Sequence, residues 1–547
     1  MASTEEIAPK SDESDVQYAV DQTGFGKFTI KLAVLGGLIY MNTGLCIGSV
    51  GFILPSAACD LELTTLDKGR ISATPILGMV FGAYFWGCFA DLRGRKSALL
   101  YALFSYAIIE FVTSLVTNYW IFLLLKFFSG WAMNGQGTIV FTYVGEFQSN
   151  EFREKILCWM EMAWTIGIII LPLVAWVIIP LEFAYVVEGF LFRSWNLFII
   201  VCAIPSVIIA TWLTYFPDTP KFLAESNQDE KFARTLEKMY TENTGCTFDE
   251  YLDKLRKNGY ENLRTKLTLA AMKKNSTGAE ASPRESTRKS NSLLNMLRTV
   301  VTQTINLWKP PHLYPTIIVC GLMYCFGSSY YALMLWFPEL FQRFAEFESS
   351  QPGEASSVCK ISSYNQMMTN DSKTDVVCSS TIQSDVYLHT LILGLACLPV
   401  SIILPLLVNK LGYKFYMIIS ASVASMVTVG FFYVSSSVEN LVLSCIFEAF
   451  SSVCMSIIFC LVVDLFPTNL RALAASLCGL FARIGALVGN SLFGVLIDNY
   501  CVPLIGIIAG QLILSTILSF LIPGKSKKLK NQINQMDQYE KKINSTL

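Results

Sequence analysis

Long apolar blocks, each about the length of a membrane-spanning helix, recur through the sequence and limit its fold more than any other feature. A helix needs about 20 apolar residues to cross the bilayer core, and only helices or closed barrels satisfy their backbone there. Hydrophobic residues make up 53% and charged residues only 15% of the 547 positions, which excludes a soluble globular protein. We predict an all-α membrane protein with twelve spanning helices, at residues 28–54, 70–90, 97–117, 120–146, 156–179, 194–216, 313–338, 387–408, 415–434, 440–464, 472–497 and 502–523.

Positive charges are unevenly distributed between the two sets of loops that these helices would leave. The loops near residues 93–96, 153–155 and 410–414, the 217–312 segment and the C-terminal tail are rich in lysine and arginine, whereas the alternate loops carry few. Cytoplasmic loops carry this excess in membrane proteins. We therefore expect both termini to be cytoplasmic, in a multi-pass protein of the plasma membrane or of an intracellular vesicle.

Part of the sequence recurs 318 positions later without a gap, which indicates a duplication. Gly94 falls on Gly412, and Lys96 falls on Lys414. We accordingly divide the chain into two bundles of six helices each, in the layout of two rocking bundles. The predicted parts are a cytoplasmic tail at 1–27, a first bundle at 28–216, a cytoplasmic linker at 217–312, a second bundle at 313–523 with an outer loop at 340–386, and a tail at 524–547.

The linker between the bundles has helical periodicity over residues 228–257, with Phe232, Leu236, Met239 and Leu252 on the repeat. Apolar residues at this spacing line one face of a helix. The pattern predicts short amphipathic helices beneath the membrane.

The loop after the second predicted helix contains four charged residues: Asp91, Arg93, Arg95 and Lys96. A basic cytoplasmic loop can simply follow the positive-inside rule. The flanking glycines and the acid favour a latch instead, in which the carboxylate pairs with arginines in one arrangement of the bundles and is released in the other. The second copy is weaker, because Asn409 replaces the acid and Tyr413 replaces the second arginine.

Two further pairs of residues recur with the same offset, at the cytoplasmic ends of the fourth and tenth helices: Glu146 with Arg153, and Asp464 with Arg471. A solvated ion pair contributes little to stability. The recurrence of both pairs favours a gating role over that reading, and we expect each pair to brace the cytoplasmic face of its own half.

Charged residues inside a bilayer are costly and mark functional sites. Glu110 and Lys126 lie equally far from Asn118, the centre of a helical hairpin, so they fall at the same depth on antiparallel neighbours and can pair. That pair is either structural or part of a substrate or coupling site. Glu448 and Arg483 are further candidates, one to carry a proton and the other to bind an anion.

Most of the 16 cysteines lie inside apolar blocks, where a thiol packs as a small hydrophobe. Cys359 and Cys378 differ, because they share the long outer loop, which faces an oxidising compartment in this topology. We expect a disulfide between them. The same loop holds a glycosylation sequon at Asn370.

The sequence does not support an enzyme. It has no Walker loop, which excludes ATP-driven transport, and its two histidines, His312 and His389, are not in metal-ligand spacing. We expect no cofactor, no metal and no nucleic-acid partner.

Several motifs resemble those of the major facilitator superfamily: Gly87 to Lys96, the Glu146 and Asp464 pairs, and Pro217-Asp218-Thr219-Pro220-Lys221-Phe222-Leu223, which is similar to sugar-porter signatures. A narrower resemblance is to the synaptic vesicle glycoprotein 2 family, carried by residues 51–57, 139–147 and 329–338. The resemblance implies that the seventh and tenth helices line a central cavity. Three tyrosines of the seventh helix then suit a polar or ring-bearing solute, unless they only pack: Tyr324, Tyr330 and Tyr331.

The chain departs from that narrower family in two places. Thr43 and Cys46 stand where its members carry two acids in the first helix, which weighs against carboxylate coupling there. The outer loop at 340–386 is too short for the family's large luminal domain.

We therefore predict a monomeric secondary transporter that moves a small organic solute across the lipid bilayer by alternating access. The alternative is a membrane binding or trafficking protein that keeps the fold without transport. Loss of the acids in the first helix favours this alternative, whereas the two gate pairs favour transport.

Overall fold

The computed structural model describes residues 12–522, apart from residues 182, 188–189, 274–301, 303, 352–356, 364–381 and 467. Within these residues, eleven helices are long and apolar enough to cross a membrane, so the prediction of an all-α multi-pass membrane protein is confirmed. They are α2 (Lys27–Ser56), α3 (Thr65–Arg93), α4 (Arg95–Thr113), α6 (Asn150–Ile178), α7 (Ser194–Leu213), α13 (Leu313–Ser350), α15 (Ser384–Leu411), α16 (Tyr413–Gly430), α17 (Ser437–Leu465), α18 (Thr468–Leu496) and α19 (Cys501–Leu521).

The remaining predicted span, at 120–146, coincides with α5 (Tyr119–Gly145). This helix has 27 residues and packs against α3 and α4. It is not among the eleven, and it carries four buried polar side chains: Lys126, Ser129, Asn134 and Gln136. A helix stands at each of the twelve predicted positions, and eleven of these helices, within the described residues, have the length and composition of a membrane span.

The chain forms two compact units. The N-terminal unit holds the chain through α11, the Leu335–Ser349 part of α13 and the part of α15 that ends at Leu398. The C-terminal unit holds α13 up to Met334, the segment Ser350–Asp371 and the chain from Pro399 onward. Both α13 and α15 therefore contribute residues to each unit.

Helix ends follow local chemistry. Thr64 caps α3, because its hydroxyl accepts a hydrogen bond from the Asp67 amide at 3.2 Å while the Asp67 carboxylate accepts one from the Thr64 amide at 3.3 Å. Asn118 caps α5 by accepting hydrogen bonds from two backbone amides. Gly94, with φ of +95°, separates α3 from α4, a conformation that other residues rarely adopt.

Small residues bring helices into close contact within each unit. A side chain at Gly78 of α3 would collide with the Phe127 carbonyl of α5, and one at Gly485 of α18 would collide with the Tyr324 carbonyl of α13. Lipid offers no hydrophobic drive for helix association, so such close packing supplies much of it.

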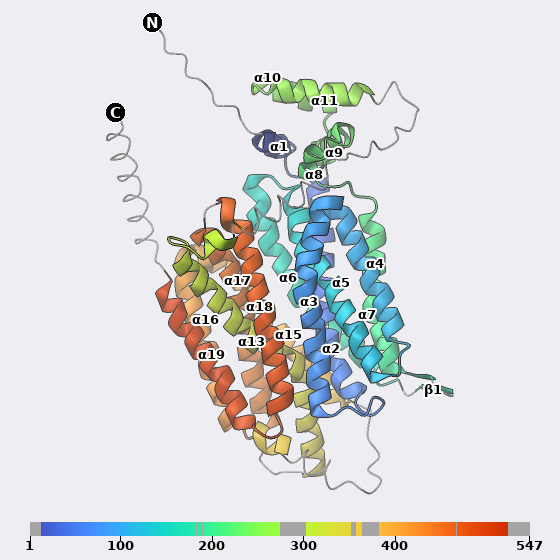
Figure 1. Ribbon diagram of the computed structural model, residues 1–547, viewed down its shortest axis with the longest axis vertical. Coiled ribbons are helices and arrows are strands. Elements are labelled where there is room, and N and C mark those ends of the chain that lie inside the picture. Colours follow the sequence, from blue (N-terminus) through green and yellow to red (C-terminus); the bar gives the residue numbers. More distant parts are fainter. Residues whose placement is uncertain are drawn as a thin grey trace. The chain divides into compact units, whose positions relative to one another are not determined.

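Short helices form a layer beyond one end of the spanning helices of the N-terminal unit (Figure 1). They are α1 (Asp12–Asp21), α8 (Pro220–Glu225), α9 (Asp229–Thr244), α10 (Phe248–Lys257) and α11 (Glu261–Lys273). The helices predicted at 228–257 are confirmed as α9 and α10, and their repeat residues are buried, as Leu236 shows. Tyr251 ties the layer together by donating its hydroxyl to the Ala19 carbonyl of α1 at 2.8 Å.

The spanning helices of the N-terminal unit have two ends with different chemistry. We call the end where α3 meets α4 at Gly94 the latch end. We call the other end the hairpin end, because there two short strands, β1 (Ala184–Val187) and β2 (Phe190–Arg193), join α6 to α7 as an antiparallel hairpin.

Candidate functional site

Three charged residues meet at the latch end of the N-terminal unit, and we call them the latch: Asp91, Arg95 and Glu146. The Arg95 guanidinium lies 3.1 Å from the Asp91 carboxylate and 3.2 Å from the Glu146 carboxylate. The side chains of Arg95 and Glu146 are only 12% and 16% exposed, against 41% for Asp91. The pair with Glu146 is therefore the better shielded from water, and shielding strengthens an ion pair.

Asp218, in the loop after α7, holds the first turn of α4. Its carboxylate accepts hydrogen bonds from the Lys96 amide at 3.3 Å and from the Thr219 amide at 2.8 Å. A side chain at Gly94 would collide with this carboxylate. Burial raises the pKa of the Asp218 carboxyl, although the hydrogen bonds from these amides act to lower it. Burial likewise raises the pKa of Glu146, although the positive charge of Arg95 acts to lower it.

The other predicted latch residues make different contacts. Arg93 is exposed at the end of α3. Lys96 donates its ammonium to the Thr214 carbonyl beyond the end of α7, at 2.8 Å. A cation among the last carbonyls of a helix is favourable there, so this lysine joins α4 to α7.

The sequence suggested that Arg153 pairs with Glu146, but the two side chains do not pair. Its guanidinium donates to the Gly145 carbonyl at 2.9 Å and to the Gln17 side chain of α1 at 2.7 Å. Glu146 is left to Arg95. Arg153 thus links the end of α5 to the layer of short helices.

The C-terminal unit repeats part of this arrangement. Gly412 separates α15 from α16 with φ of +82°, and Lys414 donates to the Phe520 and Ile522 carbonyls at the end of α19, at 2.8 and 2.6 Å. Arg471 donates to the Phe466 carbonyl at 3.5 Å, much as Arg153 uses a backbone carbonyl. The side chain of Asp464 lies outside the described part of the chain.

The predicted pairing of Glu110 and Lys126 is confirmed. The Lys126 ammonium lies 2.8 Å from the Glu110 carboxylate, which also accepts a hydrogen bond from Ser129. Both charged side chains are almost fully buried between α4 and α5. Acid, base and hydroxyl thus satisfy one another inside the N-terminal unit.

One face of α17 in the C-terminal unit carries a row of buried polar side chains, which we call the α17 polar face: Asn440, Ser444, Glu448 and Ser451. Each has a polar atom without a hydrogen-bond partner among the described residues. The Tyr330 hydroxyl of α13 hydrogen-bonds to Glu448, and the Tyr330 ring packs edge-on against that of Tyr331. Buried polar groups are normally satisfied, so this face is suited to water or a polar ligand.

Comparisons with known proteins agree with this arrangement. The family model described as "Sugar (and other) transporter" matches residues 10–279, and the model described as "Major Facilitator Superfamily" matches residues 379–544. The fold matches that of the xylose transporter XylE from E. coli in a partially occluded inward-open conformation, with a TM-score of 0.60 over 91% of this chain and 100% of the other, at 14% sequence identity. The chain belongs to the major facilitator superfamily.

Relatives within the superfamily include synaptic vesicle glycoprotein 2A of Rattus norvegicus, which is 30% identical over 326 residues, covering 58% of this chain and 42% of that protein. Synaptic vesicle glycoprotein 2C of the same species is 35% identical over 229 residues, covering 41% of this chain and 31% of that protein. The chain thus spans less than half the length of these curated relatives.

A second ion cluster lies at the hairpin end of the N-terminal unit. It was not predicted from the sequence. Glu339 of α13 lies 2.6 Å from the Lys68 ammonium of α3 and 3.0 Å from the Arg343 guanidinium, which also donates to Thr65 at 3.2 Å. We call these four residues the hairpin-end cluster. The spacing of Glu339 and Arg343, four residues apart in an apolar helix, was the available signal.

The disulfide predicted between Cys359 and Cys378 is wrong. Cys359 is bonded to Cys501 at the start of α19, with the two Cα atoms 5.4 Å apart. The loop alone does not determine the pairing, because helix packing brings a residue 142 positions away within reach. Cys378 and the sequon residue Asn370 lie outside the described residues.

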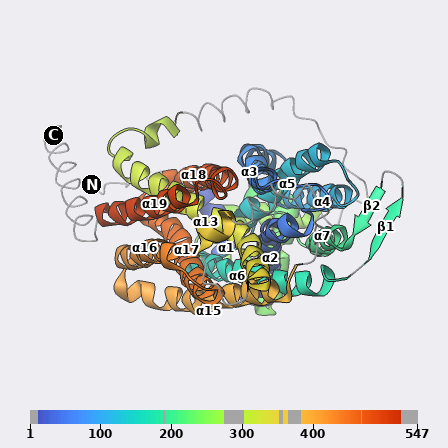
Figure 2. The ribbon, with the colours of Figure 1, turned by 90° about the horizontal axis from the view of Figure 1, so that it is seen from below.

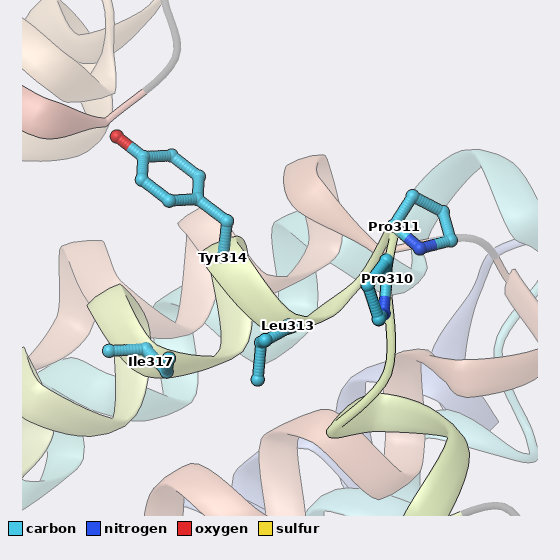
Figure 3. A pocket seen from close by; sticks show the side chains of 5 residues that line it. All are labelled: Pro310, Pro311, Leu313, Tyr314 and Ile317. Carbon is cyan, nitrogen blue, oxygen red and sulfur yellow. The ribbon is translucent and has the colours of Figure 1, made fainter.

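The remaining candidates lie in the C-terminal unit. The Arg483 guanidinium lies beside Gly479 on its own helix, α18, and Tyr324 is half-buried in α13. A small hollow at the start of α13 is lined by Pro310, Pro311, Leu313, Tyr314 and Ile317 (Figure 3). Its one polar side-chain group, the Tyr314 hydroxyl, already donates to the Leu521 carbonyl at 2.8 Å. This lining is poorly suited to a polar solute.

Proposed function

We propose that this protein is a secondary transporter of a small polar organic solute, with the α17 polar face forming part of the solute or coupling-ion site. The observation that carries the proposal is the set of partnerless polar atoms on one buried helix face. A protein that served only as a scaffold would gain stability by replacing them with apolar groups. Retaining them is understandable when water, a solute or a proton occupies the face during function.

The two ion clusters support alternating access. The latch joins the α3–α4 turn to the end of α5 at one end of the helices, and the hairpin-end cluster joins α3 to α13 at the other. We propose that the latch end faces the cytoplasm and that the hairpin-end cluster holds the opposite face closed. Such pairs can exchange between two arrangements of packed helices.

A solute screen in liposomes tests the proposal. Purified protein would be reconstituted and exposed to labelled sugars, organic acids and organic cations, with and without a pH gradient. We expect saturable uptake of one class, with a large loss in Glu448→Gln, which removes the ionisable carboxyl, and in Tyr330→Phe, which removes the hydroxyl that bonds to it. Val442→Ala, at an exposed position of the same helix, is the matched control and should transport normally.

Two outcomes would contradict parts of this proposal. Uptake that persists in both Glu448→Gln and Tyr330→Phe would remove the α17 polar face from the pathway. Uptake that ignores the pH gradient would remove Glu448 as a proton carrier while leaving it as a solute ligand.

The second candidate function is a membrane binding or trafficking protein without transport. It is favoured by α2, which contains no acidic residue, and in which Thr43 donates its hydroxyl to the Ile39 carbonyl of its own helix. If this candidate is right, no solute class will accumulate, and detergent extracts of vesicle membranes will yield a stable complex with defined stoichiometry.

A further inference from the structure

The β1–β2 hairpin of the N-terminal unit is unusually apolar for an exposed segment. Tyr185 pairs with Phe192, and Val186 pairs with Leu191 across the strands. Residues directly opposite each other share a face, and successive residues alternate between faces. Both faces are therefore apolar, and Arg193 at the base is the only charged residue in the two strands.

The hairpin is also exposed. The side chains of Tyr185, Val186 and Val187 are 62%, 66% and 50% exposed. Figure 2 shows both strands projecting beyond α4 and α7, away from the helices of their own unit. An isolated two-stranded hairpin is at best marginally stable in water, and a sheet that faces water normally has a polar face. Something other than water is expected to cover it.

The base of the hairpin fixes its direction. The Arg193 guanidinium lies 3.1 Å from the Asp60 carboxylate, which also accepts a hydrogen bond from the Trp195 indole at 2.7 Å. Asn196 accepts from the Arg193 amide and donates to the Ser114 carbonyl, each at 2.8 Å. These bonds attach the base to the α2–α3 loop and to the end of α4. The apolar strands are thus held beside the ends of helices that cross the membrane.

The surface leading into the hairpin is the surface that faces lipid. Val177, in the last turn of α6, is 71% exposed, and Leu181, just beyond it, is 47% exposed. An exposed apolar side chain on a membrane-crossing helix contacts lipid. The residues between Val177 and Val187 are apolar except Glu182, which lies outside the described residues, so the hairpin continues this surface with one charged position before it.

We propose that the strands β1 and β2 lie in the lipid bilayer at the hairpin end of the N-terminal unit, at the boundary between head groups and acyl chains. Open strand edges cannot be accommodated in the hydrocarbon core, where their amides would lack partners. Aromatic side chains and partly hydrated strand edges are both suited to the interface. The hairpin then acts as an interfacial anchor that resists movement of α6 and α7 along the membrane normal.

Photo-crosslinking in bilayers tests this proposal without depending on transport. The photoreactive residue p-benzoylphenylalanine would be placed at Val186 in the full chain, reconstituted in phosphatidylcholine nanodiscs and irradiated, and adducts would be identified by mass spectrometry. Val177 on α6 is the lipid-facing control, and Lys257, exposed on α10, is the water-facing control. A probe at Val187 examines the opposite face of the hairpin.

We expect lipid adducts at Val186 and Val187 with a yield comparable to that at Val177 and well above that at Lys257. A yield as low as that at Lys257 at both positions would overturn the proposal. Crosslinks to a second copy of the chain in place of lipid would also overturn it, because the hairpin would then be an interface between proteins.

Discussion

The two turns at Gly94 and Gly412 have the same backbone but different electrostatics. Both glycines have positive φ and both lie between consecutive spanning helices. Each is followed two residues later by a lysine that binds carbonyls at the end of another helix, Lys96 beyond α7 and Lys414 at α19. Only the first turn carries an arginine, and within the described residues a shielded ion pair is seen at that turn alone.

The features shared by the two turns are those that the fold itself requires, whereas the ion pair belongs to the N-terminal half. The glycine and the lysine satisfy backbone geometry and helix-end carbonyls, which any copy of the fold must do. Neither the backbone geometry nor the helix-end contacts depend on the ion pair, since the second turn forms without an arginine. We infer that Arg95 serves gating in the N-terminal half.

The largest effect is expected for alanine at the two glycines. Either substitution should cost about 1–2 kcal/mol because of the positive φ. Gly94→Ala should lose about 1–3 kcal/mol more, because its side chain would collide with Asp218, whereas a side chain at Gly412 meets nothing within 4 Å among the described residues. Chemical unfolding in detergent measures the difference. Equal losses would show that the turns are packed alike.

The next effect concerns the ion pair itself. Arg95→Gln should lower the free energy of unfolding by about 1–3 kcal/mol, because Glu146 is left charged and shielded without its partner. Glu146→Gln in the same chain should recover part of this loss. A double-mutant cycle with no coupling would mean that the pair contributes nothing, and would leave the two halves equivalent.

The lysines should give matched, smaller effects. Lys96→Met and Lys414→Met each remove a cation from helix-end carbonyls, at a cost of about 1 kcal/mol. Thermal unfolding of the two variants under identical conditions is the measurement. If only Lys96→Met destabilises, the lysine contact is a property of the N-terminal half and not of the duplicated fold.

The smallest effect is expected from building the missing pair. Asn409→Asp together with Tyr413→Arg places an acid and an arginine four residues apart, as at Asp91 and Arg95. We expect a coupling of about 0.3–0.5 kcal/mol, measured by a double-mutant cycle that cancels the loss of the tyrosine. A coupling much larger than this would indicate that the second turn is already organised for an ion pair.

The sequence was sufficient for the fold and for contacts that topology determines. The apolar blocks located the eleven helices of the described residues that qualify as membrane spans, and also α5. The equal distances of Glu110 and Lys126 from Asn118 placed these two residues at one depth, where they pair. In a helical hairpin, the depth of a residue follows from its distance to the turn, and the sequence shows where the turn is.

Contacts that depend on how helices rotate and cross were not predictable in this way. Glu146 bonds to Arg95 and not to Arg153, which is nearer in the sequence. Packing of α3, α4 and α5 decides which side chain reaches it. Glu339 was missed for the same reason, since its partner Lys68 lies on a helix 271 residues away. Spacing along a chain carries no information about such pairs without coordinates.

The Cys359–Cys501 bond sets a schedule for the synthesis of this protein. At about 5–20 residues per second, the 142 residues that separate the two cysteines take on the order of 10–30 seconds to make. Throughout that interval Cys359 is without its native partner, while Cys378 has already been synthesised. Correct oxidation therefore requires either that Cys359 stays reduced until the last membrane helix is inserted or that an early bond is exchanged afterwards.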